Sequence, residues 1–155
     1  MRRIWTIGLV ALFFTACEAY YKSSIPNVRF RFHCDLRQAE YMFLSTPGQF
    51  LKKTRNANGI PVGYGGLIIG QSVYSEGYTF VAYDAACPVE VDQRVTVDIV
   101  DEGLQKAVCP KCGTIYDLNN GAYPVNRKGG EYLKPYRVHV VFDSLGKPVE
   151  LDVQN

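Results

Sequence analysis

The chain has 155 residues, of which 47% are hydrophobic and 21% charged, which is ordinary usage for a single globular domain with a core. Its formal net charge is +2, and without Arg2 and Arg3 the basic and acidic side chains are equal in number. No run of lysines or arginines stands out. We therefore expect no nucleic-acid partner held through phosphate contacts.

The first 16 residues are predicted to be a signal peptide. Arg2 and Arg3 form a short positive region, and residues 4–15 form an apolar stretch without a charge. Because a bilayer span needs about 20 apolar residues, this stretch is too short to cross a membrane.

The end of this leader, residues 14–17 with the sequence Phe-Thr-Ala-Cys, resembles the lipobox of bacterial lipoproteins, although Phe14 stands where leucine is usual. That resemblance implies that Cys17 becomes the lipidated first residue of the mature chain. Residues 17–26 would then be the lipidated cysteine and a tether, and residues 27–155 the folded domain. The expected partner is the membrane, and the expected place is the bacterial cell envelope outside the cytoplasm. An ordinary secretory signal with an incidental cysteine is the alternative.

Residues 28–36 open the domain with strict alternation of apolar and polar side chains. A period of two is typical of a strand with one buried face. Cys34 belongs to the apolar face, so it is predicted to be a small core residue, with metal ligation or a disulfide as the alternative. His33 points the other way and is predicted to lie at the surface.

Further strands follow, separated by turns rich in glycine, proline and asparagine. No stretch after the leader carries a long helical period, so the fold class is predicted to be all-β. The expected strands are residues 50–54, 67–70, 78–83, 95–100, 106–108, 114–118, 136–143 and 149–153.

Two proline-bearing cysteine motifs carry the chemistry. Cys87 precedes Pro88, and the second motif is Cys-Pro-Lys-Cys-Gly at residues 109–113, with Cys109 and Cys112. Thiolates are the ligands that iron–sulfur clusters and zinc prefer, so Cys87, Cys109 and Cys112 are the predicted metal ligands. Glu90 is the candidate for a fourth ligand, because it stands three positions after Cys87.

The surroundings of these motifs resemble the Rieske-type 2Fe–2S domain, and more narrowly the Rieske-like lipoproteins of Bacteroides-type bacteria. That family carries Cys-x-His in one loop and Cys-x-x-His-Gly in a second, followed by an aromatic-Asp strand and a glycine turn. Most of residues 60–153 take part. The matching segments are Ala-Tyr-Asp-Ala-Ala-Cys-Pro at 82–88, Ala-Val-Cys-Pro-Lys-Cys-Gly-Thr-Ile-Tyr-Asp-Leu at 107–118, Gly121, and Leu-Lys-Pro-Tyr-Arg-Val at 133–138.

The resemblance implies an antiparallel β-sandwich whose base uses strands from both ends of the chain, with a small cluster-binding subdomain at residues 84–123. It places Cys87 and Cys109 at the family's two cysteine positions. Val89 stands where the first histidine would be and cannot bind a metal, whereas Cys112 replaces the second histidine with a thiol. Two aromatic-Asp pairs, at 83–84 and 116–117, would shape the base of the site.

Three states of the cysteine site stay open at this point. The first is an altered 2Fe–2S centre, and the second is a zinc or iron ion in a knuckle. The third is a metal-free site in which a disulfide joins two loops, which an oxidising compartment favours. The first would make the chain an electron-transfer module with a redox protein partner. The others would make it a non-redox envelope lipoprotein. No nucleophile–base set or phosphate loop stands out, so we do not expect an autonomous enzyme.

Overall fold

The computed structural model describes residues 23–74, 77, 79–100, 105–127 and 130–155. The predicted leader and Cys17 lie outside these ranges. Among the described residues no helix is long and apolar enough to cross a membrane.

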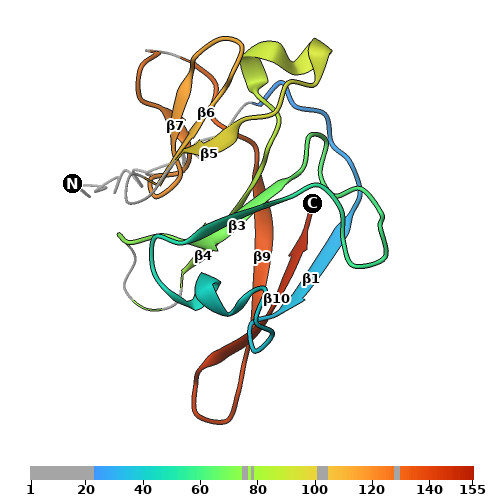
Figure 1. The fold of residues 1–155 in the computed structure, drawn as a ribbon, viewed down its shortest axis with the longest axis vertical. Coiled ribbons are helices and arrows are strands. Elements are labelled where there is room, and N and C mark those ends of the chain that lie inside the picture. Colours follow the sequence, from blue (N-terminus) through green and yellow to red (C-terminus); the bar gives the residue numbers. More distant parts are fainter. Residues whose placement is uncertain (1–22, 75–76, 78, 101–104, 128–129) are drawn as a thin grey trace, which may run out of the picture.

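Six strands form the larger of two antiparallel sheets, in the order β1-β10-β9-β4-β3-β2 (Figure 1). The first and last strands of the chain are neighbours, with Phe32 opposite Val153, so both ends of the domain build the same sheet. The strands are β1 (Arg31–Asp35), β2 (Phe50–Lys53), β3 (Leu67–Gln71), β4 (Phe80–Asp84), β9 (Pro135–Phe142) and β10 (Pro148–Gln154).

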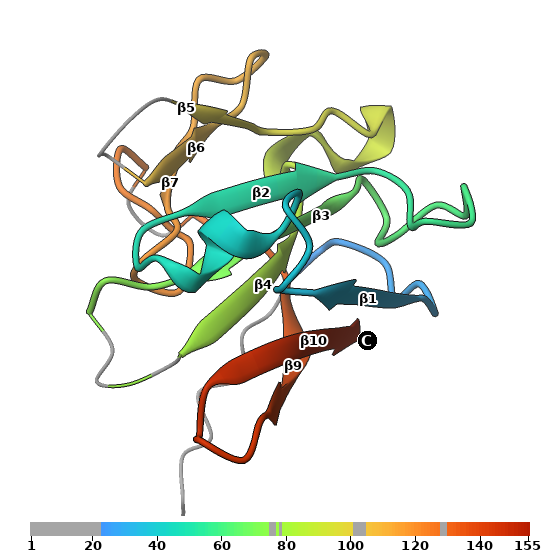
Figure 2. The ribbon, with the colours of Figure 1, turned by 60° about the horizontal axis from the view of Figure 1, so that its bottom comes forward.

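Four short strands form the smaller sheet, in the order β5-β6-β7-β8. It sits at one end of the molecule, and the turn between β9 and β10 lies at the opposite end (Figures 1 and 2). The strands are β5 (Asp98–Val100), β6 (Lys106–Val108), β7 (Ile115–Asp117) and β8 (Tyr123–Pro124). Two 3₁₀ helices accompany the sheets, η1 (Met42–Ser45) and η2 (Pro88–Gln93).

The hydrophobic core has two parts. One part is built on the large sheet, with Phe32, Leu44 and Leu151 almost fully buried. The other lies between the large sheet and the small one, where Ile68 and Tyr116 pack with the cysteine loops. The cysteine site is therefore anchored to its own core.

The all-β prediction is confirmed, and so is the alternation at the start of the domain. Phe32, Cys34 and Leu36 are buried, whereas Arg31 and His33 are exposed. The sequence analysis did not anticipate the two 3₁₀ helices or the two-residue strand β8. Part of the expected tether, residues 23–26, lies against the domain, with Ile25 only 3% exposed.

Candidate metal centre

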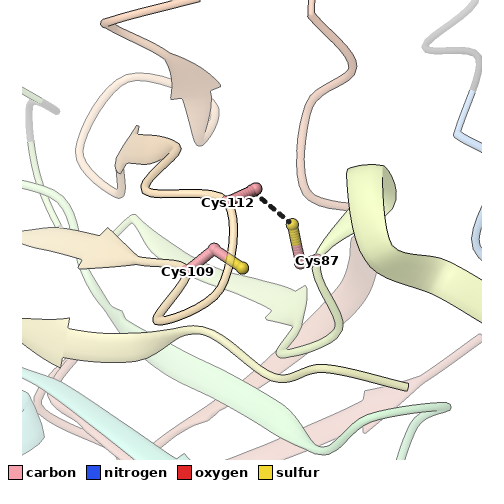
Figure 3. Close-up of side chains that lie close together, drawn as sticks. All are labelled: Cys87, Cys109 and Cys112. Carbon is pink, nitrogen blue, oxygen red and sulfur yellow. Dashed lines mark hydrogen bonds between the residues drawn. The ribbon is translucent and has the colours of Figure 1, made fainter. Parts of the chain in front are cut away.

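Three thiols lie close together where the loop after β4 faces the β6–β7 turn (Figure 3). Cys87 follows β4 and immediately precedes η2, whose first residue is Pro88. Cys109 directly follows β6, and Cys112 lies in the turn that leads to β7. The structure thus brings together the three cysteines that the sequence analysis predicted as ligands.

The three Sγ atoms lie within 4.8 Å of one another. The Sγ atoms of Cys87 and Cys112 are 3.6 Å apart. A zinc–thiolate bond is about 2.3 Å long, so two sulfurs on one ion are at most about 4.6 Å apart. Because small side-chain shifts bring all three sulfurs within that limit, this group could hold a metal ion.

The thiols differ in exposure and in acidity. Cys87 and Cys109 are buried, at 0% and 1% exposure, whereas Cys112 is partly exposed. Burial raises the pKa of the Cys87 thiol to about 11, although a hydrogen bond from Tyr116 works against this rise. Burial also opposes ionisation of Cys112, but hydrogen bonds from Thr114 and the other two thiols outweigh it and lower the Cys112 pKa. Cys112 is therefore the thiol that faces solvent and ionises more readily than Cys87.

The turn that carries Cys109 and Cys112 is held by backbone hydrogen bonds. The Gly113 N–H donates to the Cys109 carbonyl at 3.0 Å, and the Cys109 N–H donates to the Thr114 carbonyl at 2.9 Å. Gly113 adopts a φ of +68°, which suits glycine because it lacks a Cβ. Asn126 reinforces the turn, since its side-chain amide donates to the Gly113 carbonyl at 2.8 Å.

Two hydroxyl groups contact the sulfurs. The Tyr116 hydroxyl lies 3.4 Å from Cys87 Sγ, and the Thr114 hydroxyl lies 3.1 Å from Cys112 Sγ. Burial and the neighbouring Cys87 raise the pKa of Tyr116, so its phenol stays protonated. Both hydroxyls can therefore donate hydrogen bonds to thiolates, which stabilises the charged form that binds metal.

Glu90 lies outside the group of three thiols. Its Oε2 atom accepts a hydrogen bond from Lys111 Nζ at 2.5 Å, so the two charges pair across the gap between the cysteine loops. The structure thus gives Glu90 a partner other than a metal. Val89 is 38% exposed and offers no ligand atom.

Asp84 fixes the loop that presents Cys87. Its carboxylate is fully buried and accepts hydrogen bonds from the backbone N–H groups of Tyr64, Gly65 and Ala86 and from the Tyr136 hydroxyl. A buried carboxylate needs this number of donors to offset its lost hydration. The aspartate therefore has a structural role beneath the site.

Cys34 is remote from this group, in the core of the large sheet. It is 1% exposed, and burial raises the pKa of its thiol to about 12. Its prediction as a core residue is confirmed. The described residues contain a single group of three or more histidine, cysteine or acidic ligands, and Cys34 is not in it.

No family model matches this chain, and a search of curated proteins finds no relative. What the site can hold therefore follows from its donor set. Three thiols suit a soft metal ion and leave one coordination position for a ligand from outside the group. For a two-iron cluster they supply three of the four protein ligands it usually takes.

The sequence pointed to the three candidate ligands but to few of the groups that support them. Thr114 was assigned to a strand without a role at the sulfurs, and Tyr116 was expected only to shape the base of the site. They share the strand's buried face with Leu118, and this alternation is the signal that points them toward the thiols. The pairing of Lys111 with Glu90 has no such signal, because it depends on how two loops distant in sequence meet.

Proposed function

We propose that this chain is a lipid-anchored electron-transfer protein of the bacterial cell envelope, with iron held by Cys87, Cys109 and Cys112 as an altered iron–sulfur centre. The observation that carries the proposal is the convergence of the three thiols within 4.8 Å at one end of an all-β domain. The resemblance of the two cysteine loops to the Rieske type supports iron as the metal.

Burial of the site supports electron transfer over substrate chemistry. With Cys87 and Cys109 enclosed, only Cys112 offers an approach from solvent. A partner could exchange electrons with the site through the partly exposed Cys112 without contacting the two buried thiols. The centre would supply one-electron redox chemistry, while the protein holds the ligands and limits water.

The ligand types set the expected potential. Replacement of neutral histidines by thiolates makes a centre more negative and harder to reduce, so its potential falls toward that of all-cysteine clusters. Val89 and Cys112 occupy the two histidine positions of the resembled family. We therefore place this centre below the Rieske range. Hydrogen bonds from Tyr116 and Thr114 would act in the opposite direction, because they stabilise the reduced, more negative state.

A structural clamp is the second candidate, and the distance of 3.6 Å between the sulfurs of Cys87 and Cys112 favours it. Those sulfurs need only a small approach to form a disulfide, and an envelope compartment is oxidising. A zinc ion would serve the same purpose and needs no redox change. In either form the site would tie the loop after β4 to the β6–β7 turn.

Metal and sulfide analysis separates these functions. The domain without its leader is purified anaerobically, and iron, zinc, acid-labile sulfide and visible absorption are measured per chain. We expect iron with sulfide and a coloured protein. A colourless protein that holds zinc, or a metal-free protein with a disulfide formed before handling, would refute electron transfer.

A matched pair of variants tests the ligand assignment. Cys112→Ser should bleach the visible spectrum and lower the iron content, because it removes one of three thiolates. Cys34→Ser removes a thiol from the other core and should leave the iron content unchanged. An unchanged spectrum in Cys112→Ser would remove that residue from the site.

A further inference from the structure

The segment that precedes β1 is fixed against the cysteine end of the domain. We call residues 23–27 the strap. The Ser24 hydroxyl donates to the carbonyl of Pro88, the residue that follows Cys87, at 3.0 Å. The Ser24 N–H donates to Glu131 Oε2 at 2.7 Å. The strap therefore touches the loop of the candidate metal centre directly.

A buried lysine holds the strap in place. Lys134 is 9% exposed, and its ammonium donates to the carbonyls of Ile25 at 3.3 Å and Pro26 at 3.2 Å and to the Asn27 side chain. An ammonium has three donors, and all three find acceptors in this one segment. Release of the strap would break all three of these hydrogen bonds together, which favours the bound strap.

The strap is also close along the chain to the predicted anchor. Ser24 stands seven residues after Cys17, and seven residues span at most about 25 Å when fully extended. Figure 1 shows the strap starting beside η2, at the end that carries the small sheet, whereas the β9–β10 turn lies at the far end. The length of the linker therefore limits how far the cysteine end can lie from the bilayer.

We infer that the strap holds the domain with its cysteine end toward the membrane surface and its β9–β10 turn away from it. The inference rests on the lipid anchor at Cys17 in the proposed function. A partner that exchanges electrons through Cys112 then works in the space between the domain and the bilayer. Rotation about a free tether would not impose this orientation.

Energy transfer to labelled lipids measures the orientation. The full-length lipidated chain, purified from membranes, is placed in vesicles whose lipids carry an acceptor dye. An azide-bearing residue replaces either Gln93, at the exposed end of η2, or Leu145, which is 85% exposed in the β9–β10 turn, and is coupled to a donor dye. These positions leave all native cysteines unlabelled.

The expected result is unequal transfer. Because a domain of this size is roughly 35 Å across, we expect transfer from position 145 to be at least about tenfold slower than from position 93. Equal transfer, or faster transfer from position 145, would overturn the inference. Cys17→Ser tests the anchor separately, since a protein that still binds vesicles without this thiol refutes the proposed lipidation and not the fixed strap.

Two variants test the cause of the orientation. Lys134→Met removes the ammonium and should bring transfer from positions 93 and 145 close together. Ser24→Ala combined with Glu131→Gln weakens the strap without removing a buried charge, and it should reduce the difference between the two positions. If the orientation is unchanged in the Ser24→Ala/Glu131→Gln protein and in any Lys134→Met protein that folds, the strap is not its cause.

Discussion

Removal of the Tyr116 hydroxyl should weaken metal binding in addition to weakening the metal-free fold. Tyr116→Phe keeps the buried ring and deletes a hydroxyl that lies 3.4 Å from Cys87 Sγ. In the metal-free protein this contact is a neutral hydrogen bond, worth about 1 kcal/mol. In the metal-bound protein the sulfur is a thiolate, and a hydrogen bond to a charged group contributes roughly 1.5–3 kcal/mol.

The difference between the two values, about 0.5–2 kcal/mol, sets the expected loss of affinity. Since about 1.4 kcal/mol corresponds to a factor of ten, Tyr116→Phe should bind metal roughly 2- to 30-fold more weakly. The assay is competition with a chelator of known affinity, with Co²⁺ as a coloured probe of thiolate ligation. Urea unfolding of the metal-free protein gives the change in stability separately.

Tyr83→Phe is the matched control. Tyr83 is buried in the same core as Tyr116, but its hydroxyl donates to the Leu118 carbonyl at 3.3 Å. This variant should lose stability by a similar amount and keep its metal affinity. If Tyr116→Phe binds Co²⁺ as tightly as the unchanged protein, or if both variants lose affinity equally, the hydroxyl does not act on the sulfur.

The Lys111–Glu90 ion pair and the two thiols of unequal acidity can each be tested separately. Lys111→Ala breaks an ion pair with Glu90 that is open to solvent on the lysine side, so unfolding should change by less than about 1 kcal/mol. Release of metal into excess chelator should nevertheless be several-fold faster in Lys111→Ala, because the two cysteine loops separate more easily. Lys111→Arg keeps the positive charge and should release metal as slowly as the unchanged protein. Equal release rates in Lys111→Ala and the unchanged protein would contradict this. In the metal-free protein at pH 8, iodoacetamide should modify Cys112 before Cys87, because Cys112 has a lowered pKa and burial raises that of Cys87 to about 11. Because only the thiolate reacts, Cys87 should become reactive only as the pH rises toward 11. If mass spectrometry shows that Cys87 is modified before Cys112, the order of acidity of the two thiols is wrong.

The strands were predictable because their signal is local. The alternation at β1 and the apolar runs at β3 and β4 identify strands without knowledge of their partners. Helix η2 was missed because its turns depend on short-range hydrogen bonds after Cys87, with no repeating apolar pattern.

The three candidate ligands of the site could be predicted from the sequence, but most of their surroundings could not. Cysteine-proline motifs are typical of metal sites by residue type alone, so Cys87, Cys109 and Cys112 could be named before it was known that they lie together. The docked strap could not, because it needs Lys134 to fold back onto a segment more than one hundred residues earlier in the chain. Long-range contacts of this kind have no local pattern.

A redox titration of the anaerobically purified protein tests whether the cysteine site carries electrons. Visible absorption and electron paramagnetic resonance are followed while the potential is lowered in steps. We expect reversible uptake of one electron per chain, at a potential nearer the roughly −400 mV of all-cysteine ferredoxin clusters than the Rieske range, and its loss in Cys112→Ser. A protein that takes up no electron reversibly, or whose redox signal survives Cys112→Ser unchanged, would contradict it.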